Sequence, residues 1–156
     1  MSKNLSLIEK FTQSVLLFDG GMGTELYNRG VFINKCFEEL NLSNPSLVKQ
    51  VHSDYKKAGA DVLETNTFGA NRYKLKSYQL FDKIYRINFE GARIAREIAG
   101  EDIYVAGAIG PLGARIEPLG PISNEEAQQY FSEQIKPLLD GGVDLFILET
   151  FVYPEE

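Results

Sequence analysis

Asp19 is the first residue of the chain whose type and position suggest chemistry. It directly follows the apolar run Val15–Phe18 and precedes the glycine-rich loop Gly20–Gly23. Backbone N–H groups of such a loop can hold an anion, but a tight turn without a ligand, capped by the Asp19 carboxylate, would use the same residues. The loop does not match a dinucleotide fingerprint, because Leu26 stands where the third glycine should be. No Gly-Lys-Ser/Thr sequence of a P-loop occurs either.

Glu149 is the second such residue, because it follows the apolar residues Phe146-Ile147-Leu148. Burying a carboxylate there is costly unless it has a partner. Asp19 and Glu149 could together hold a cationic group such as a substrate ammonium. A salt bridge from Glu149 to Arg72 or Arg115 is the structural alternative.

Four short apolar runs must position these residues. Their length, their few charges and their flanking glycines favour strands that are buried on both faces, as in a parallel sheet. The runs are Val15–Phe18, Asp61–Leu63 with its extension to Phe68, Ile103–Ile109 and Val143–Phe151. Working residues of parallel α/β proteins lie at the carboxyl ends of strands, which here also include Asn66, Thr67 and the segment Gly107–Gly113.

Three amphipathic helices are predicted between these runs. The first begins at Ser43-Asn44-Pro45 and ends at Gly59, the second runs from Phe81 to Gly100, and the third is capped by Ser123 and ends at Gly141. Ser123 and Glu126 have the spacing of a capping box, and Pro137 should kink the third helix or end it early. Strands that alternate with helices predict a parallel sheet with right-handed crossovers.

An internal repeat supports this architecture. Residues 59–68 align without a gap with residues 142–151, which pairs Asp61 with Asp144 and Thr67 with Thr150. Repetition of an αβ unit is typical of a (β/α)8 barrel. Because such a barrel needs about 250 residues, we interpret residues 1–156 as a single partial domain, the first half of a TIM-type barrel with about four strands and three helices.

Composition excludes several other classes of protein. The 156 residues have a net charge of −6 and no cluster of Lys or Arg, which argues against nucleic acid or an anionic membrane as a partner. No run approaches the roughly 20 residues of a membrane span, and no signal peptide is evident. One cysteine excludes an internal disulfide, and a cytoplasmic location is expected.

Four further side chains are expected to carry no function. His52 is predicted to lie on a solvated helix face, and Lys74–Lys76 to be solvated surface. Cys36 lies in a polar connection without an obvious base beside it, so we expect it to be a bystander rather than a nucleophile.

At its four strand ends the chain resembles the homocysteine S-methyltransferase family, which includes the homocysteine-binding module of methionine synthases. The order and separation of the motifs match the first four strands of that family's barrel, from about Val15 onward. These motifs are Phe18–Leu26, Ala58–Ala70, Ala106–Pro111 and Asp144–Thr150.

The resemblance implies transfer of a methyl group to the thiol of homocysteine, which forms methionine. Asp19 and Glu149 match positions that hold the substrate amino group, and Gly20, Gly21, Met22, Asn66 and Thr67 would line the pocket. The family binds Zn2+ through three cysteine thiolates of the second half of the barrel, which this chain lacks. We therefore expect the complete enzyme to use zinc, and this chain to bind none and to be inactive alone. The methyl donor could be a folate, S-methylmethionine or betaine.

Two alternatives to the enzyme remain open: a half-barrel scaffold that self-associates, and an open-sheet nucleotide-binding domain. Self-association is expected in any case, since the first and fourth strands would be open edges. We expect Leu17, Val105 and Phe146 to form an apolar inner face exposed to water, which a homodimer would cover.

Overall fold

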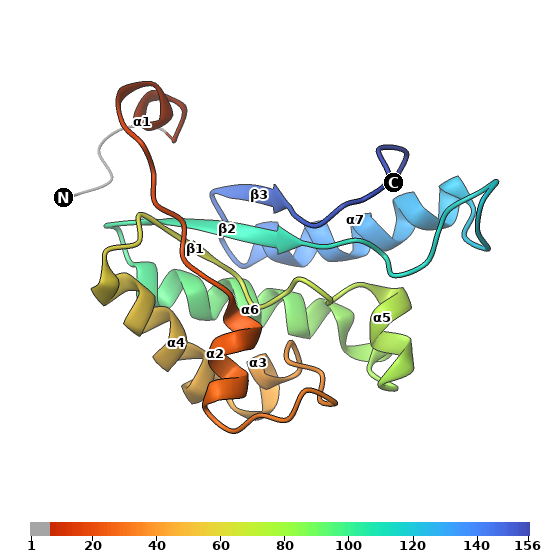
Figure 1. Cartoon of the computed structure of the whole chain (residues 1–156), viewed down its shortest axis with the longest axis horizontal. Coiled ribbons are helices and arrows are strands. Elements are labelled where there is room, and N and C mark those ends of the chain that lie inside the picture. The colour runs from red at the N-terminus through yellow and green to blue at the C-terminus, as the bar shows by residue number, and fades with distance from the viewer. Residues whose placement is uncertain (1–6) are drawn as a thin grey trace.

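The computed structural model describes residues 7–156 and shows a parallel sheet with helices packed on one face (Figure 1). Strands β1 (Val62–Glu64), β2 (Tyr104–Ile109) and β3 (Leu145–Leu148) pair in the order β1-β2-β3, with Val62 beside Tyr104 and Ala106 beside Leu145. The parallel βα architecture expected from the sequence is confirmed. It brings the carboxyl ends of all three strands to the same edge of the sheet.

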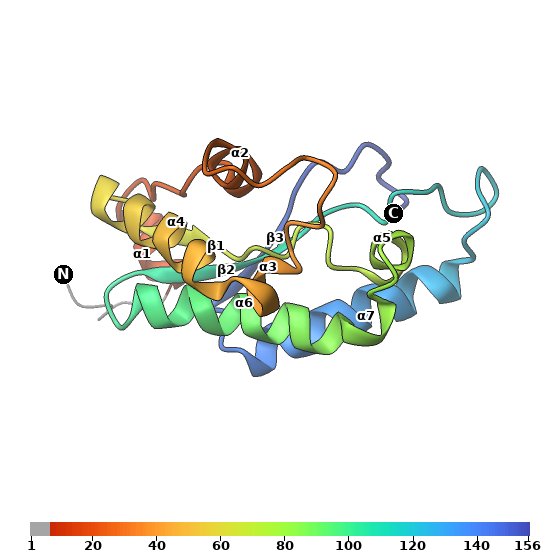
Figure 2. The ribbon, with the colours of Figure 1, turned by 90° about the horizontal axis from the view of Figure 1, so that it is seen from below.

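Helices α4 (Pro45–Ala58), α6 (Ile84–Ala99) and α7 (Asn124–Asp140) cover the sheet, and α6 and α7 lie side by side (Figure 2). Helix α1 (Leu7–Gln13) lies on the opposite side of the sheet (Figure 1). None of the helices in residues 7–156 combines the length and apolarity that a membrane span requires.

The ends of the three long helices follow the local sequence. The Asn44 side chain accepts a hydrogen bond from the backbone N–H of Leu47 at 3.3 Å, and Gly59 ends α4 with a φ of 102°. The predicted capping box of Ser123 and Glu126 is present at the start of α7. Of the two outcomes expected for Pro137, the early end of the helix is wrong, because α7 continues to Asp140 and the Pro137 carbonyl accepts a bond from Gly141 at 2.9 Å.

Several short helices were not predicted. They connect strand ends to the covering helices, and their four to seven residues are too few to show an apolar period. They are α2 (Met22–Asn28), α3 (Leu40–Ser43) and α5 (Arg72–Ser77). The predicted second helix begins with the 3-10 turn η1 (Phe81–Lys83) and continues as α6.

The first predicted strand, Val15–Phe18, is reduced to a single parallel bridge between Phe18 and Val62. The Leu17 carbonyl accepts from the backbone of Asp61 at 2.8 Å, and the backbone of Asp19 donates to the carbonyl of Val62 at 3.0 Å. In the described chain this segment has β1 on one side and no strand on the other, and 94% of Val15 is exposed. An edge paired on one side only is held less firmly than a central strand, which explains why the predicted strand is incomplete.

The assignment of Val105 and Phe146 to an open inner face is wrong, whereas Leu17 is 58% exposed. Val105 is fully buried in a cluster with Leu63 and with Ala95 and Ala99 of α6, and Phe146 packs against a cluster that includes Leu138 of α7. Because side chains alternate along a strand, the opposite face carries the neighbouring residues. These are Val62, Tyr104 and Ala106, packed with Leu7, Leu16, Phe18, Leu145 and Ile147.

The two copies of the internal repeat use their paired aspartates in the same way. An oxygen of Asp61 accepts from the backbone N–H of Leu17 at 3.0 Å, and an oxygen of Asp144 accepts from that of Val105 at 2.8 Å. Each aspartate thus joins the start of its own strand to the preceding one. Gly59 and Gly142, two residues before them, both have positive φ angles.

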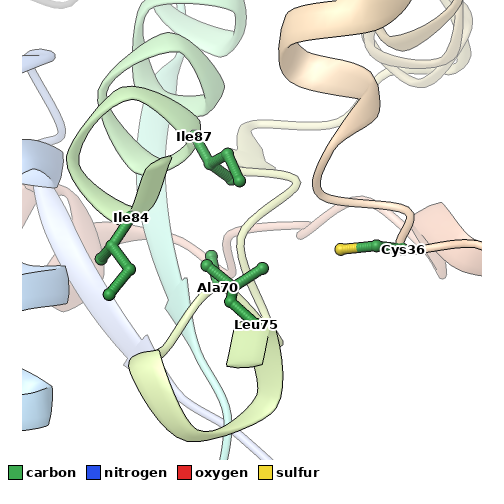
Figure 3. Packing of buried hydrophobic residues seen from close by; sticks show 5 residues of the cluster. All are labelled: Cys36, Ala70, Leu75, Ile84 and Ile87. Carbon is green, nitrogen blue, oxygen red and sulfur yellow. The ribbon is translucent and has the colours of Figure 1, made fainter. Parts of the chain in front are cut away.

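Two residues expected in polar surroundings are buried. His52 has no exposed surface, and neither of its ring nitrogens has a hydrogen-bond partner among the described residues. Desolvation lowers the pKa of His52 to about 4, so the prediction of a solvated histidine is wrong. Cys36 is 8% exposed and lies beside the cluster formed by Ala70, Leu75, Ile84 and Ile87 (Figure 3).

Candidate functional site

A pocket of about 340 Å³ lies at the carboxyl ends of the strands. Of the residues predicted to bind substrate, Gly20, Gly21, Met22, Asn66, Thr67 and Glu149 line it. They come from three parts of the sequence, the loop before α2, the segment after β1 and the residue after β3. The structure therefore brings these predicted residues together.

Asp19, the remaining predicted residue, does not line the pocket but contacts Glu64, which does. Its Oδ1 accepts a hydrogen bond from the backbone N–H of Glu64 at 3.0 Å, and Glu64 itself lines the pocket. This bond joins Asp19, at the end of the segment Val15–Phe18, to the carboxyl end of β1.

Asp19, Glu64 and Glu149 form a group of three carboxylates with perturbed acidity. Burial is the main cause of the rise in the pKa of Asp19 to about 7, and the charges of Glu64 and Glu149 add to it. Burial and the charge of Glu149 raise the pKa of Glu64 to about 7, and burial also raises the pKa of Glu149. A cation entering the pocket would relieve this repulsion and stabilise the ionised carboxylates.

Neither arginine suggested as a structural partner of Glu149 serves that role. Arg72 pairs with Glu133, its Nε lying 2.7 Å from a carboxylate oxygen. Arg115 instead stacks on the ring of Tyr153 at 4.6 Å. The positive charge that acts on Glu149 is that of Lys74, which offsets part of the rise in its pKa.

Asn66 and Thr67 are tied to neighbouring segments by their side chains. The Asn66 amide donates to the carbonyl of Phe37 at 2.7 Å and to the side-chain oxygen of Asn41 at 3.1 Å. The Thr67 hydroxyl donates to the carbonyl of Ala108 at 2.8 Å. These bonds hold the wall of the pocket in shape, and the backbone carbonyls of the two residues also accept bonds, from the side chains of Asn41 and Gln134.

Glu64, Phe37 and Glu38 also line the pocket and were missed as site residues. Glu64 ends an apolar run as Asp19 and Glu149 do, so the same signal could have found it. Phe37 and Glu38 come from an irregular connection without any period. Glu38 is held there because one carboxylate oxygen accepts from the backbone N–H of Gly69 at 2.7 Å.

Gly110 fixes the position of another wall residue, Phe68. A Cβ atom at Gly110 would lie 2.3 Å from the Phe68 ring, and the backbone N–H of Gly110 donates to the Phe68 carbonyl at 3.1 Å. Only glycine allows this approach. The predicted strand end Gly107–Gly113 therefore shapes the pocket by packing against Phe68.

The residues that the structure describes do not fit a zinc site. No three His, Cys, Asp or Glu side chains in residues 7–156 lie together in a way that could hold a metal ion. The Cys36 thiol donates to Glu38 at 3.2 Å, and burial together with that carboxylate raises the pKa of Cys36 to about 12. A thiol that resists ionisation is a poor metal ligand and a poor nucleophile.

The fold and pocket define a parallel α/β protein with an acidic site at the carboxyl ends of its strands. The family model of homocysteine S-methyltransferase matches residues 16–156. The chain belongs to this family.

Known relatives and solved structures agree with this assignment. The chain is 35% identical to a methionine synthase of Mycobacterium leprae and 34% identical to one of Mycobacterium tuberculosis, in each case over 92% of this chain. The metallated form of the homocysteine methyltransferase MmuM from Escherichia coli superposes with a TM-score of 0.79 at 25% identity, and the oxidized form with 0.75 at 27%.

The chain corresponds to only part of these proteins. It spans 13% of the length of either methionine synthase and 57% of the metallated MmuM chain, while 93% of this chain is covered in the latter comparison. This coverage agrees with the N-terminal part of a larger barrel.

Proposed function

We propose that this chain forms the amino-acid-binding half of an enzyme that methylates the thiol of homocysteine to give methionine. The observation that carries the proposal is the group of three carboxylates, Asp19, Glu64 and Glu149, beside a glycine-rich loop in a member of the homocysteine S-methyltransferase family. Asp19 and Glu149 would hold the substrate ammonium, and the backbone of Gly20–Gly23 would face the rest of the amino acid.

Glu64 gives the ammonium site a third charge. Its raised pKa of about 7 leaves it partly protonated near neutral pH, and a bound ammonium would shift it toward the ionised form. Binding of substrate would then release protons. The same coupling applies to Asp19, whose pKa is also raised to about 7.

The thiol end of the substrate requires groups outside this chain. Because the described residues do not fit zinc, we assign no thiol activation to them, and we propose that residues 1–156 act as a partial domain without methyltransferase activity of their own. The complete barrel would supply the metal ligands and bind the methyl donor.

The proposal is tested by titrating the chain with homocysteine and with methionine while following backbone amide NMR signals. We expect weak binding, with a dissociation constant above about 1 mM and thus less than about 4 kcal/mol of binding free energy. Shifts should centre on the Gly20–Gly23 loop. Asp19→Asn and Glu149→Gln should each weaken binding severalfold, because each removes a charge from the ammonium site.

Asp82→Asn, a substitution on η1 outside this pocket, serves as the control and should leave the affinity unchanged. Unchanged affinity in both site variants would contradict the assignment of Asp19 and Glu149 to the substrate ammonium.

A further inference from the structure

Lys74, which the sequence placed on the solvated surface, lies over the pocket wall. Its Nζ is 4.4 Å from the centre of the Phe68 ring, and Phe68 lines the pocket. The side chain is half-buried, and desolvation lowers the pKa of Lys74, while the charges of Glu38, Glu149 and Glu156 act in the opposite direction. The expectation of a solvated lysine is therefore wrong at this position.

The fold fixes this position through the neighbouring residue. Leu75 is fully buried and points from α5 toward Ala70, Ile84 and Ile87 (Figure 3). With Leu75 anchored, α5 turns Lys74 onto the side of the helix that faces Phe68. The stem of Lys74 also passes Gly113, where a Cβ atom would lie 3.2 Å from its Cε.

The Lys74 ammonium has no hydrogen-bond or ion-pair partner in residues 7–156; its contact there is the aromatic ring. The other charged side chains at the pocket, Asp19, Glu64, Glu149 and Glu38, are all carboxylates. The site thus has an acidic group and, behind Phe68, one cation on which the charges of Glu38 and Glu149 act without a direct ion pair.

We propose that Lys74 is the residue that recognises the carboxylate of the amino-acid substrate. This inference rests on the proposed function, because it assumes that an amino acid occupies the pocket. A zwitterionic amino acid presents an ammonium and a carboxylate two bonds apart. The ammonium would meet Asp19 and Glu149, and the carboxylate would pair with Lys74, whose ammonium is already partly desolvated over Phe68.

Lys74 would thereby select amino acids over amines. A simple amine satisfies the acidic group equally well, but it leaves Lys74 unpaired. The same charge would disfavour a free cation such as K+, which brings no negative group for the lysine.

The test compares homocysteine with 3-aminopropane-1-thiol, the same molecule without its carboxylate, by NMR titration of the full chain. The wild-type chain should bind homocysteine about tenfold more tightly than the amine, since it gains a charge-assisted contact. In Lys74→Met this preference should fall to about onefold, while the affinity for the amine stays the same or rises slightly. Lys74→Arg should keep most of the preference, because it keeps the charge.

Lys76→Met is the matched control, since Lys76 lies on the same helix α5 and is exposed. It should retain the tenfold preference of the wild-type chain. The affinity for the amine reports in each variant whether the pocket is intact, so a loss of folding cannot be mistaken for a loss of selectivity.

A Lys74→Met variant that still prefers homocysteine by about tenfold would overturn the inference and assign the carboxylate to the backbone amides of Gly20–Gly23. In that case the proposed function would stand. A wild-type chain that binds neither compound would overturn the proposed function and the role of Lys74 together.

Discussion

Asp19 shows how one side chain of this site combines a structural and a functional role. Its Oδ1 accepts from the backbone of Glu64, which joins two neighbouring segments of the sheet, while its burial raises its pKa to about 7. A hydrogen bond from a backbone N–H lowers the pKa of a carboxylate, so desolvation and the nearby negative charges outweigh this bond. The ionised carboxylate of Asp19 is thus destabilised by its surroundings, which is typical of a group that binds a cationic ligand.

The raised pKa of Asp19 predicts an unusual pH dependence of stability. The folded chain binds the Asp19 proton up to about pH 7, whereas the unfolded chain releases it near the ordinary pKa of 3.8. The carboxyl therefore contributes stability that is complete below the unfolded pKa and is lost as the pH rises through about 7. Asp19→Asn stays neutral and lacks this dependence.

We expect the wild-type chain to lose stability relative to Asp19→Asn as the pH rises from about 4 to about 7.5. Urea unfolding at several pH values in this range measures the difference. The comparison with the variant is needed because His52, with its pKa lowered to about 4, acts in the opposite direction. Glu101→Gln, an exposed change at the turn before β2, is the control. Parallel pH curves for the wild-type chain and Asp19→Asn would contradict the prediction.

The αβ unit is the element that repeats in this chain, and its aspartate is part of the sheet. Asp61 and Asp144 each accept from a backbone N–H of the preceding strand segment, that of Leu17 and that of Val105. Asp144 also pairs with Arg96 of α6, so it connects a strand to its covering helix. Both copies of the repeat thus contain an aspartate that bonds the start of its strand to the backbone of the preceding strand segment.

Asp144→Ala should destabilise the chain by about 1–3 kcal/mol, because it leaves the N–H of Val105 without its acceptor. Chemical denaturation followed by circular dichroism would measure this loss. Asp140→Ala, which removes an exposed ion pair with Lys136 at the end of α7, should cost less than about 1 kcal/mol. Equal losses of stability in the two variants would show that the hydrogen bond from Val105 adds no measurable stability.

The two faces of the sheet are covered unequally. Helices α4, α6 and α7 cover one face, whereas α1 is the helix on the other side (Figure 1), where Leu7 packs with Val62, Tyr104 and Ala106. Along the outer side of β3, Leu148 is 69% exposed, and no strand of the described chain pairs with that side. An open edge beside an apolar face is a site for pairing with another chain.

The 156-residue chain should therefore form dimers or larger species when studied alone. Light scattering across a dilution series would show them, and Leu148→Lys should weaken the association, since a lysine at an edge strand opposes pairing. The exposed substitution Glu101→Gln should not. A compact monomer that unfolds cooperatively at micromolar concentration would contradict this prediction.

The same chain should retain no zinc at stoichiometric level. The described residues offer no group of ligands, and Cys36 keeps its proton, with its pKa raised to about 12. Elemental analysis after dialysis against a chelator would measure the metal content. A zinc content near one ion per chain would show that ligands exist which neither sequence nor structure reveals.

The sequence by itself determined the order of the three paired strands and the three long helices, and the edge of the sheet where the site lies. Local signals carry this information: Asn44 and Ser123 cap helices through bonds three residues away, and Glu149 stands at the end of its own apolar run. The family motifs point to the same positions, because they lie at the ends of the strands.

The tertiary structure alone decided which face each strand residue takes, so that Val105 and Phe146 meet helices rather than solvent. It also decided that His52 is buried and that Lys74 lies over Phe68. Side chains alternate between the two faces of a strand, and the sequence does not say which set faces the helices. The neighbours of a helix face are set only when distant segments pack against it. The contact of Asp19 with Glu64 joins residues 45 positions apart, a distance over which local sequence patterns carry no information.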